Sequence, residues 1–397
     1  MKKLFPNFIL CISTVIAFFI ILEIALALLW PHKLKHRPYH EKYDPVIGWV
    51  NKPLKDDDVP FEFAPNLYFH VRHNSKGLRG KETDYPKPAG IKRILFVGDS
   101  FFWGYGLNNK DVLTEVLQKK AGESVEIING AATGYGTDQE LLWLKNEGLK
   151  YKPDIVILGF FPTNDLDEIS SSISYYFPKP VFVPDGDKLV LKNVPVPRTE
   201  GTERKAFANP PTFLGKLKKF LRYHTHTYPF IVGRLNSNPE LRLLLINLGL
   251  GEEFTNQFPG IPLIKNNPAD IEKLAFRLIL EIKKTAEKAG AEFLLVHIPS
   301  KEQPAGANLY KGIREKAYEN NATMSHKLQD FAAKEKIQLL DLLPVIRKRH
   351  KKGAIIYSPA KYDHHWTASG HQIAAETIYD YLSVHGLLSV SPASQFK

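Results

Sequence analysis

The stretch Ile94-Leu95-Phe96-Val97-Gly98-Asp99-Ser100 joins a short apolar run directly to a polar turn. An apolar run that ends at glycine is typical of a β-strand buried on both faces of a parallel sheet. Ser100 then stands where the chain is expected to turn into a helix, with its hydroxyl exposed and its backbone N–H able to help bind an oxyanion. A Gly-Asp-Ser tripeptide alone is a common turn sequence, so its place after a buried strand carries the interpretation.

Further apolar runs repeat this pattern along the chain. They are Val125–Ile128, Asp154–Leu158, Glu292–Val296 and Gln338–Leu342. Apolar residues at three- and four-residue steps predict helices between the runs, over 112–121, 139–149, 271–289 and 325–333, with another from about Ala368. Strands that alternate with helices predict an α/β fold, in which helices cover both faces of a five-stranded parallel sheet. In such sheets the functional groups gather just beyond the carboxyl ends of the strands.

The remaining sequence suggests a division into segments. Pro and Gly punctuate residues 32–90 too often for long helices, which predicts a stalk and lead-in with short extended pieces. The alternating strands and helices then predict a single domain over 91–387, interrupted by an insertion over 166–267. The last residues, 388–397, are expected to form a flexible tail.

The insertion itself contains two recognisable patterns. Val181–Val183 and Leu189–Leu191 flank Pro184-Asp185-Gly186-Asp187, which predicts a β-hairpin. The stretch Phe213–Arg222 is apolar on one helical face and basic on the other. It predicts a helix that packs on the domain or, alternatively, lies on an anionic membrane or guides an acidic glycan. We therefore expect the insertion to be a cap rather than an independent domain.

The beginning of the chain differs from the rest. From Leu4 to Leu29 the only charged side chain is Glu23, and a helix of this length, at about 1.5 Å per residue, can cross a hydrocarbon core of about 30 Å. The run ends at Leu29-Trp30-Pro31 without a cleavage-site pattern, which favours an uncleaved single-pass anchor over 1–31 above a signal peptide or a buried core helix. The orientation stays open because the flanking basic residues nearly balance: Lys2, Lys3, Lys33, Lys35 and Arg37.

Composition excludes several classes of function. The net charge of +11 is modest for 397 residues, and no zinc-finger spacing or other recognisable motif accompanies it, so no nucleic-acid partner is expected. The single cysteine, Cys11, excludes an intrachain disulfide, thiol catalysis and cysteine-rich zinc sites. Adjacent His364 and His365 beside Asp363 could ligate a metal, but no third ligand motif is evident. We therefore expect no metal and no other cofactor.

Two motifs that follow other strands could supply further oxyanion donors. The Gly-rich run Asn129–Gly136 comes after the second strand, where a glycine lets the backbone approach a ligand and point an N–H at it. Asn164 comes after the third strand, and its side-chain N–H can serve the same purpose. Taken singly, each is also explained as a plain turn or a helix cap.

A possible base follows the fifth strand. In Asp363-His364-His365-Trp366, His365 would take the proton of Ser100, while Asp363 would fix the tautomer of the imidazole and stabilise the imidazolium. His364 is a weaker rival for the same role. Lys301 and Glu302, after the fourth strand, either line the substrate cleft or are ordinary surface charges.

At these residues the chain resembles the SGNH (GDSL-like) hydrolase superfamily, over about Asn74 to Leu387. The resemblance implies a three-layer α/β/α flavodoxin-like sandwich and makes Ser100 the nucleophile. It assigns the oxyanion hole to the N–H of Ser100, the N–H of Gly134 and the side chain of Asn164. It makes His365 the base.

This chain departs from the superfamily at two places. The usual spacing is Asp-x-x-His, whereas this chain has Asp363-x-His365 followed by Trp366, which is similar to the branch that contains the periplasmic alginate O-acetylation proteins. In addition, Pro162-Thr163 precede Asn164 where many members have glycine. The first departure bears on Asp363 as the partner of His365, and the second on the conformation of the loop.

The leading hypothesis is a serine esterase that acts on O-acyl esters, possibly of glycans or lipids, through an acyl-Ser100 intermediate. The alternatives are an O-acyltransferase that modifies a cell-envelope polysaccharide, a non-catalytic glycan-binding protein on the same fold, and a metal-dependent hydrolase. The expected partners are an ester or acylated glycan or lipid substrate and, through the N-terminal helix, a membrane. The catalytic domain is expected to be periplasmic or extracellular.

Overall fold

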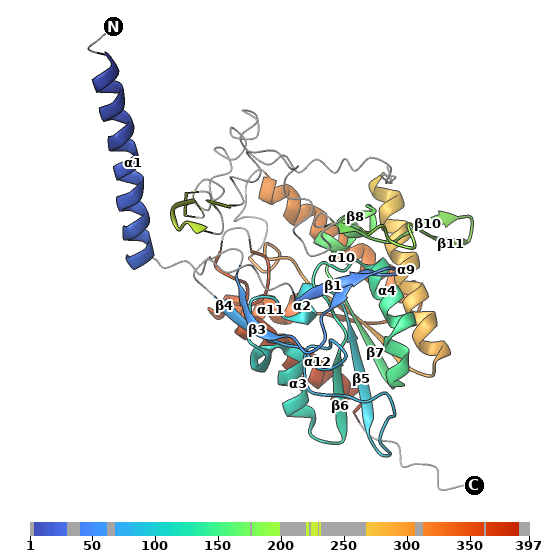
Figure 1. Ribbon diagram of the computed structural model, residues 1–397. Helices are drawn as coiled ribbons and strands as arrows, with labels where there is room; N and C mark the ends of the chain where they lie inside the picture. The colour runs from blue at the N-terminus through green and yellow to red at the C-terminus, as the bar shows by residue number, and fades with distance from the viewer. Residues whose placement is uncertain are drawn as a thin grey trace, which may run out of the picture. The chain divides into compact units, whose positions relative to one another are not determined.

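Figure 1 shows a computed structural model of the chain, which describes residues 4–29, 40–61, 68–174, 177–198, 220–221, 224–228, 230–231, 267–305, 313–360 and 363–388. The chain divides into two compact units. The smaller unit consists of Met1–Pro38, Val59–Tyr68 and Lys205–Gln257. The larger unit consists of Tyr39–Asp58, Phe69–Arg204 and Phe258–Lys397, and it contains every residue of the predicted site.

A five-stranded parallel sheet forms the centre of the larger unit (Figure 1). Its strands are β5 (Lys92–Val97), β6 (Val125–Asn129), β7 (Ile155–Phe160), β12 (Glu292–His297) and β13 (Gln338–Asp341). They lie in the order β13-β12-β7-β5-β6, so the first strand lies between the second and the third. This is the strand order of flavodoxin-like sheets, and it confirms the predicted α/β fold with a five-stranded parallel sheet and all five predicted strands.

Helices cover both faces of the sheet. On one side, α3 (Leu113–Ala121) packs against α12 (Ala368–Val384). On the other side, α9 (Pro268–Lys288) packs against both α4 (Thr137–Asn146) and α5 (Pro162–Ile169). A further helix, α10 (Ile313–Lys334), contacts α5 and β13. The α/β/α layering that the alternating pattern predicts is therefore present.

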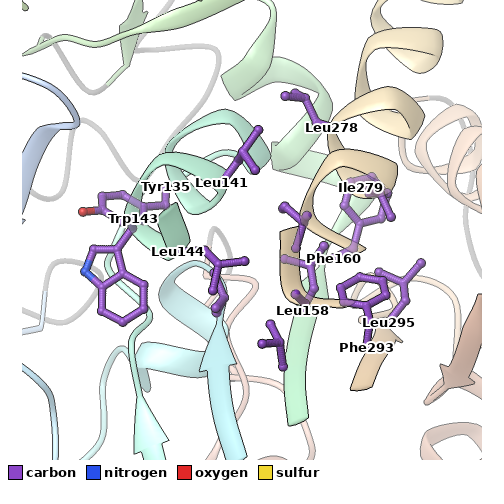
Figure 2. Close-up of a cluster of buried hydrophobic side chains, with 14 of the residues drawn as sticks. Tyr135, Leu141, Trp143, Leu144, Leu158, Phe160, Leu278, Ile279, Phe293 and Leu295 are labelled. Atoms are coloured by element: carbon purple, nitrogen blue, oxygen red, sulfur yellow. The ribbon is translucent and has the colours of Figure 1, made fainter. Parts of the chain in front are cut away.

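The main core lies between the sheet and the α4–α9 layer (Figure 2). Alternate residues of a strand point to opposite faces of its sheet, and on β5 the side chains that join this core are Leu95 and Val97. The same core contains Leu158 of β7 and Leu295 of β12, which are fully buried. Because every central strand is buried on both faces, its sequence is a continuous apolar run rather than an alternating one.

Two helices begin at side-chain caps that can be read in the sequence. The side chain of Asn267 accepts a hydrogen bond from the N–H of Asp270 at the start of α9, with Pro268 in the first helical position. The side chain of Thr367 likewise accepts a bond from the N–H of Gly370 at the start of α12. Such caps satisfy backbone donors that the first turn leaves unpaired. The cap at Thr367 also fixes where the preceding loop, which carries the predicted base, must end.

The predicted lead-in is partly built into the larger unit. Its strands are β1 (Glu41–Asp44), β2 (Gly48–Asn51), β3 (Asp56–Pro60) and β4 (Tyr68–Arg72). The indole N–H of Trp49 donates to the Thr133 carbonyl at 3.0 Å, and the hydroxyl of Tyr135 donates back to the Trp49 carbonyl at 2.7 Å. The Asn51 amide donates to the Ala131 carbonyl at 3.0 Å. These bonds hold the lead-in against the Gly-rich loop after β6.

Within the insertion, the predicted hairpin is present as β10 (Val181–Asp185) and β11 (Lys188–Lys192), which pair antiparallel. Two short strands, β8 (Ile173–Ser174) and β9 (Phe177–Pro178), precede it. The predicted basic helix over 213–222 lies outside the described residues except for 220–221, and the predicted tail lies outside them except for residue 388.

The N-terminal run forms the helix α1 (Leu4–Leu29). Among the residues that the structure describes, no helix has both the length and the hydropathy of a membrane span. In α1 the described side chains are those at positions 10, 11 and 13–29. The anchor over residues 1–31 therefore stays a prediction.

Candidate active site

Ser100 is the first residue of the short helix α2 (Ser100–Trp103), directly beyond the carboxyl end of β5. The carboxylate of Asp99 caps this helix by accepting the backbone N–H of Phe101 at 2.9 Å. The helix ends at Gly104, whose φ of 89° lies in the left-handed region that favours glycine. The Ser100 side chain is thus held on a tight strand-to-helix turn, as its place in the sequence predicts.

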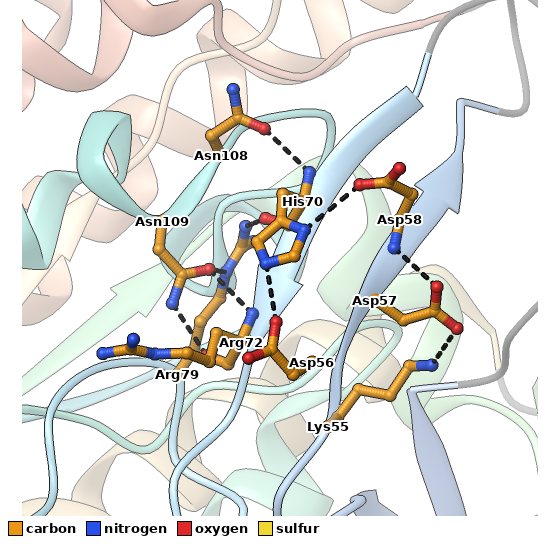
Figure 3. Close-up of polar contacts among 9 residues, drawn as sticks. All are labelled: Lys55, Asp56, Asp57, Asp58, His70, Arg72, Arg79, Asn108 and Asn109. Atoms are coloured by element: carbon orange, nitrogen blue, oxygen red, sulfur yellow. Dashed lines mark hydrogen bonds and ion pairs between the residues drawn. The ribbon is translucent and has the colours of Figure 1, made fainter.

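A buried arginine of the lead-in, Arg79, supports this turn; Figure 3 shows it beside Asn109. Arg79 is 1% exposed, and its guanidinium donates to the carbonyls of Trp103 at 2.9 Å and Gly104 at 2.7 Å. The same group lies 4.3 Å from the centre of the Trp103 ring and donates to the Asn109 side chain at 3.1 Å. It therefore satisfies the carbonyls that the end of α2 leaves unpaired.

Ser100 and His365 meet directly although they are 265 positions apart in the chain. Ser100 Oγ lies 2.8 Å from His365 Nε2, and His365 Nδ1 lies 2.6 Å from Asp363 Oδ1. Because an ionised carboxylate only accepts hydrogen bonds, the proton of the neutral imidazole belongs on Nδ1. Nε2 then has a lone pair facing the serine hydroxyl, which is the arrangement a general base needs.

The carboxyl group of Asp363 is suited to this role. It is 1% exposed, and burial by itself would raise its pKa, but the hydrogen bonds and charge of His365 outweigh burial and lower it. Asp363 is therefore ionised when the imidazole is neutral, and it can stabilise the imidazolium that forms during catalysis. Despite the shorter Asp-x-His spacing, the structure brings Asp363 rather than another carboxylate to His365.

His364 points elsewhere. Its Nδ1 lies 4.0 Å from Glu302 Oε1, and burial lowers its pKa. Among the residues that the structure describes, no group of three or more side chains gathers that could hold a metal ion.

The predicted oxyanion donors lie beside the nucleophile turn. One N–H of the Asn164 amide donates to Asp99 Oδ2 at 2.9 Å, which leaves the second N–H of the same group for a ligand. The N–H of Ala132 donates to the Gly98 carbonyl at 3.1 Å, so the Gly-rich loop runs along the turn that presents Ser100. Gly134 in this loop has a φ of 69°, which a residue with a side chain adopts only with strain.

Replacing Asn164 with alanine is expected to lower kcat by about 10²- to 10³-fold, because one preorganised donor to the developing oxyanion is lost. KM should change little, since the bond forms mainly in the transition state. Steady-state kinetics on an aryl acetate would measure both constants. Thr163→Ala is the matched control, because Thr163 is exposed and bonds to Asn321 at 3.1 Å. A kcat within threefold of wild type for Asn164→Ala would contradict the assignment.

A second Ser–His–Asp arrangement lies in the larger unit, and sequence reasoning missed it. His297 Nδ1 lies 2.7 Å from Asp341 Oδ1, and His297 Nε2 lies 3.2 Å from Ser325 Oγ. His297 and Asp341 end two strands, but only the structure shows that these strands are neighbours and that the two residues are in register. Ser325, however, donates its hydroxyl proton to the Asn321 carbonyl at 2.8 Å.

This second arrangement is not suited to nucleophilic attack. The side chain of Ser325 also accepts a bond from Gln303 at 2.9 Å, so its hydroxyl proton and one of its lone pairs are already engaged. Ser325 and His297 are 4% and 2% exposed, whereas the described side chain of His365 is 20% exposed. We assign a structural role to the second arrangement, because its hydrogen bonds join the ends of β12 and β13.

Several buried carboxyl groups interact electrostatically with one another close to Asn164. They belong to Asp99, Asp138, Glu140 and Asp165. Burial and the neighbouring carboxyl groups raise the pKa of Glu140 and of Asp165 well above the usual range. A buried ammonium, that of Lys179, pairs with Asp138 Oδ2 at 2.5 Å and donates to the Glu168 carbonyl at 3.0 Å. Nothing in the local sequence pattern pointed to this cluster.

Replacing Lys179 with methionine is expected to lower the free energy of unfolding by about 3–5 kcal/mol, because the buried Asp138 loses its partner. Burial raises the pKa of Asp138 even with Lys179 present. Without the ammonium, the folded state must bind a proton at this carboxyl, so the loss should grow as pH rises.

Urea unfolding of the full chain in detergent at pH 5.5 and pH 8 would measure this effect. Lys150→Met is the control, because Lys150 is 54% exposed and its pair with Glu147 spans 2.8 Å. Such surface pairs contribute about 0–1 kcal/mol. A Lys179→Met loss no larger than that of the control at both pH values would show that the buried pair does not stabilise the fold.

Comparison with known proteins supports the resemblance. Residues 264–397 match a family model described as an SGNH hydrolase-like domain, acetyltransferase AlgX. The match covers about a third of the chain, including Asp363 and His365 but not Ser100. The predicted resemblance to the SGNH superfamily, with a likeness to AlgX, is therefore confirmed. A search of curated proteins finds no match to the sequence.

Solved structures also resemble the chain at a distance. A lipolytic protein of the G-D-S-L family from Veillonella parvula has 9% identity and a TM-score of 0.39, with 74% of this chain and 99% of that chain covered. A GDSL-like lipase from Bacteroides thetaiotaomicron has 11% identity and a TM-score of 0.37, with 76% and 93% covered. A lipase/acylhydrolase from Enterococcus faecalis has 12% identity and a TM-score of 0.36, with 76% and 100% covered.

Proposed function

We propose that this chain is a serine-dependent enzyme that processes O-acyl esters through an acyl-Ser100 intermediate. The observation that carries the proposal is the 2.8 Å contact between Ser100 Oγ and His365 Nε2, with Asp363 on the other nitrogen of the ring. The non-catalytic alternative, a glycan-binding protein on the same fold, requires no such contact. The metal-dependent alternative is tested by whether turnover of an aryl acetate survives a chelator.

The geometry supports a two-step reaction. Ser100 Oγ attacks the ester carbonyl carbon while its proton passes to His365 Nε2, and the resulting oxyanion is held by the N–H groups of Ser100, Gly134 and Asn164. When the tetrahedral intermediate collapses, the imidazolium returns the proton to the leaving alcohol and the acyl group stays on Ser100. An acceptor O–H then gives its proton to His365 and attacks the carbonyl carbon of the acyl-enzyme. As this second tetrahedral intermediate collapses, the bond to Ser100 Oγ breaks and the imidazolium returns the proton to Ser100 Oγ.

The acceptor decides between two activities. If water attacks, the enzyme is an esterase; if a sugar hydroxyl attacks, it is an O-acyltransferase that would modify a cell-envelope polysaccharide. The match of residues 264–397 to an acetyltransferase family model is a specific observation in favour of transfer. Transfer requires that water be excluded from the acyl-enzyme, whereas hydrolysis requires that water reach it.

An experiment with competing acceptors tests both versions. The full chain in detergent is incubated with an aryl acetate donor and a panel of oligosaccharides, and the products are analysed by mass spectrometry. Acetylated oligosaccharide that disappears with Ser100→Ala would support transfer, and free acetate as the only Ser100-dependent product would support hydrolysis. Absence of turnover together with absence of labelling by a fluorophosphonate probe would overturn the enzyme proposal.

We further propose that residues 1–31 anchor the chain in a membrane and that the larger unit is periplasmic or extracellular. The support is the sequence of α1, where Glu23 is the only charged residue between Leu4 and Leu29. Deleting residues 1–31 should move the protein from the membrane fraction to the soluble fraction. An unchanged distribution would refute a sole N-terminal anchor.

A further inference from the structure

The loop that delivers the predicted base is held by a lysine from a different part of the chain. Lys301 follows β12, and its ammonium donates to three backbone carbonyls: those of Ser358 at 2.6 Å, Ala360 at 2.9 Å and Asp363 at 3.0 Å. An ammonium has three N–H donors that point in different directions. One side chain therefore gathers three carbonyls of a single loop around one charge.

These carbonyls lie on both limbs of the loop. Ser358 and Ala360 belong to the limb that leaves α11 (Leu343–Lys351), and Asp363 belongs to the limb that leads into α12. The limbs are also joined by a backbone bond from the Ser358 N–H to the His365 carbonyl at 2.9 Å. Because Lys301 bonds the backbone carbonyl of Asp363, it holds a residue that itself forms the imidazole–carboxylate contact.

A second contact ties the same two segments together. The hydroxyl of Tyr357 donates to the Pro299 carbonyl at 2.7 Å, and Tyr357 is 8% exposed. Segment 299–301 thus holds the loop at Tyr357 and again at the carbonyls beyond it. Since Pro299 lies two residues after the end of β12, the central sheet itself sets the position of the loop.

The positive charge of Lys301 offers an electrostatic alternative to a geometric role. Its ammonium lies 3.0 Å from the carbonyl oxygen of Asp363, whose side chain contacts the His365 ring. A positive charge near an imidazole disfavours the imidazolium that a general base must become. An electrostatic role would therefore predict that removing the charge speeds the reaction, whereas a geometric role predicts that it slows the reaction.

We propose that Lys301 is a positioning residue for the reaction at Ser100: its ammonium fixes the loop so that His365 Nε2 stays within hydrogen-bond distance of Ser100 Oγ. Lys301 touches none of the reacting atoms. This role rests on the proposed function, because proton transfer from Ser100 depends on the position of His365, and Lys301 is proposed to set that position. A displacement of about 1 Å in such a contact can cost about 10²-fold in rate.

The test compares Lys301→Met with Lys301→Arg in the full chain. Lys301→Met is expected to lower kcat on an aryl acetate by about 30- to 100-fold with KM within threefold of wild type. Lys301→Arg, which keeps charge and donors, should recover part of the loss. Lys327→Met is the matched control, because Lys327 also has a short contact, 2.6 Å to Glu272, but lies 48% exposed on α10. It should leave kcat unchanged.

A spectroscopic readout separates positioning from general stability and from the proposed function itself. The Nδ1 proton between His365 and Asp363 should give a low-field NMR resonance that His365→Ala abolishes, whether or not the protein turns over an ester. Lys301→Met should broaden or shift this resonance. A kcat within threefold of wild type and an unchanged resonance would overturn the proposal.

A variant that fails to fold does not remove the test. If Lys301→Met is unfolded by circular dichroism, Lys301→Gln, which keeps two of the three donors, is measured with the same two readouts and the same criteria. If wild type shows the resonance but neither turnover nor probe labelling, the proposed function fails. The effect of Lys301→Met on the resonance then still decides whether Lys301 positions His365.

Discussion

Ser100→Ala is expected to lower kcat on an aryl acetate by about 10⁴-fold or more, because the acyl-enzyme pathway is lost and only binding and the oxyanion donors remain. The expectation follows from the contact of Ser100 Oγ with His365 Nε2 at 2.8 Å. Labelling by a fluorophosphonate probe should be abolished in the same variant. Steady-state kinetics and mass spectrometry of the labelled chain would measure the two effects.

The chain offers its own control for this experiment. Ser325 also lies within 3.2 Å of a histidine that contacts an aspartate, but its hydroxyl proton is directed to a backbone carbonyl. Ser325→Ala should therefore leave probe labelling and kcat unchanged in the folded protein. Labelling that survives Ser100→Ala and disappears with Ser325→Ala would exchange the two assignments.

Asp363→Asn is expected to lower kcat by about 10⁴-fold while the protein stays folded. A carboxamide can present an N–H to Nδ1 of His365, which would place the imidazole proton on Nε2 and leave no lone pair facing Ser100. The effect should be largest near neutral pH. A pH–rate profile of wild type and variant would measure it.

The corresponding change at the second arrangement is the control. Asp341 contacts His297 at 2.7 Å, much as Asp363 contacts His365 at 2.6 Å. Asp341→Asn should affect stability rather than turnover, because His297 lies next to no available nucleophile. Equal losses of kcat in the two variants would mean that the Asp363 contact has no special part in the reaction.

Local pattern was enough to predict most of the framework. The apolar runs at Ile94–Val97 and Glu292–Val296 each lie within an observed strand. The helix predicted over 271–289 lies within α9 except for its last residue. The reason is that burial leaves a local pattern in the sequence. A strand buried on both faces is a continuous apolar run, and an amphipathic helix has apolar residues at three- and four-residue steps. The lead-in was harder, because Trp49 and Arg79 are buried by contacts with residues more than twenty positions away.

The candidate site was only partly visible in the sequence. Ser100 and His365 could be named because each follows a predicted strand, and in a parallel sheet the strands end at one edge. The cluster around Glu140 and the second arrangement at Ser325 could not be named. Glu140 and Ser325 lie on helices, whose rotation and depth depend on packing, and a buried polar residue on a helix looks the same in sequence as an exposed one.

The sequence by itself determined the order of strands and helices, the turn that presents Ser100 and the residue types available for acyl transfer, because these depend on periodicity and on neighbours along the chain. Only the tertiary structure distinguished the Ser100–His365–Asp363 contacts from the second arrangement at Ser325, which the sequence did not reveal. It brings Ser100 within 2.8 Å of His365 across 265 positions, and it directs the proton of Ser325 to the carbonyl of Asn321. The physical reason is that a hydroxyl becomes a nucleophile through what its proton faces in space, and that is set by how distant segments pack.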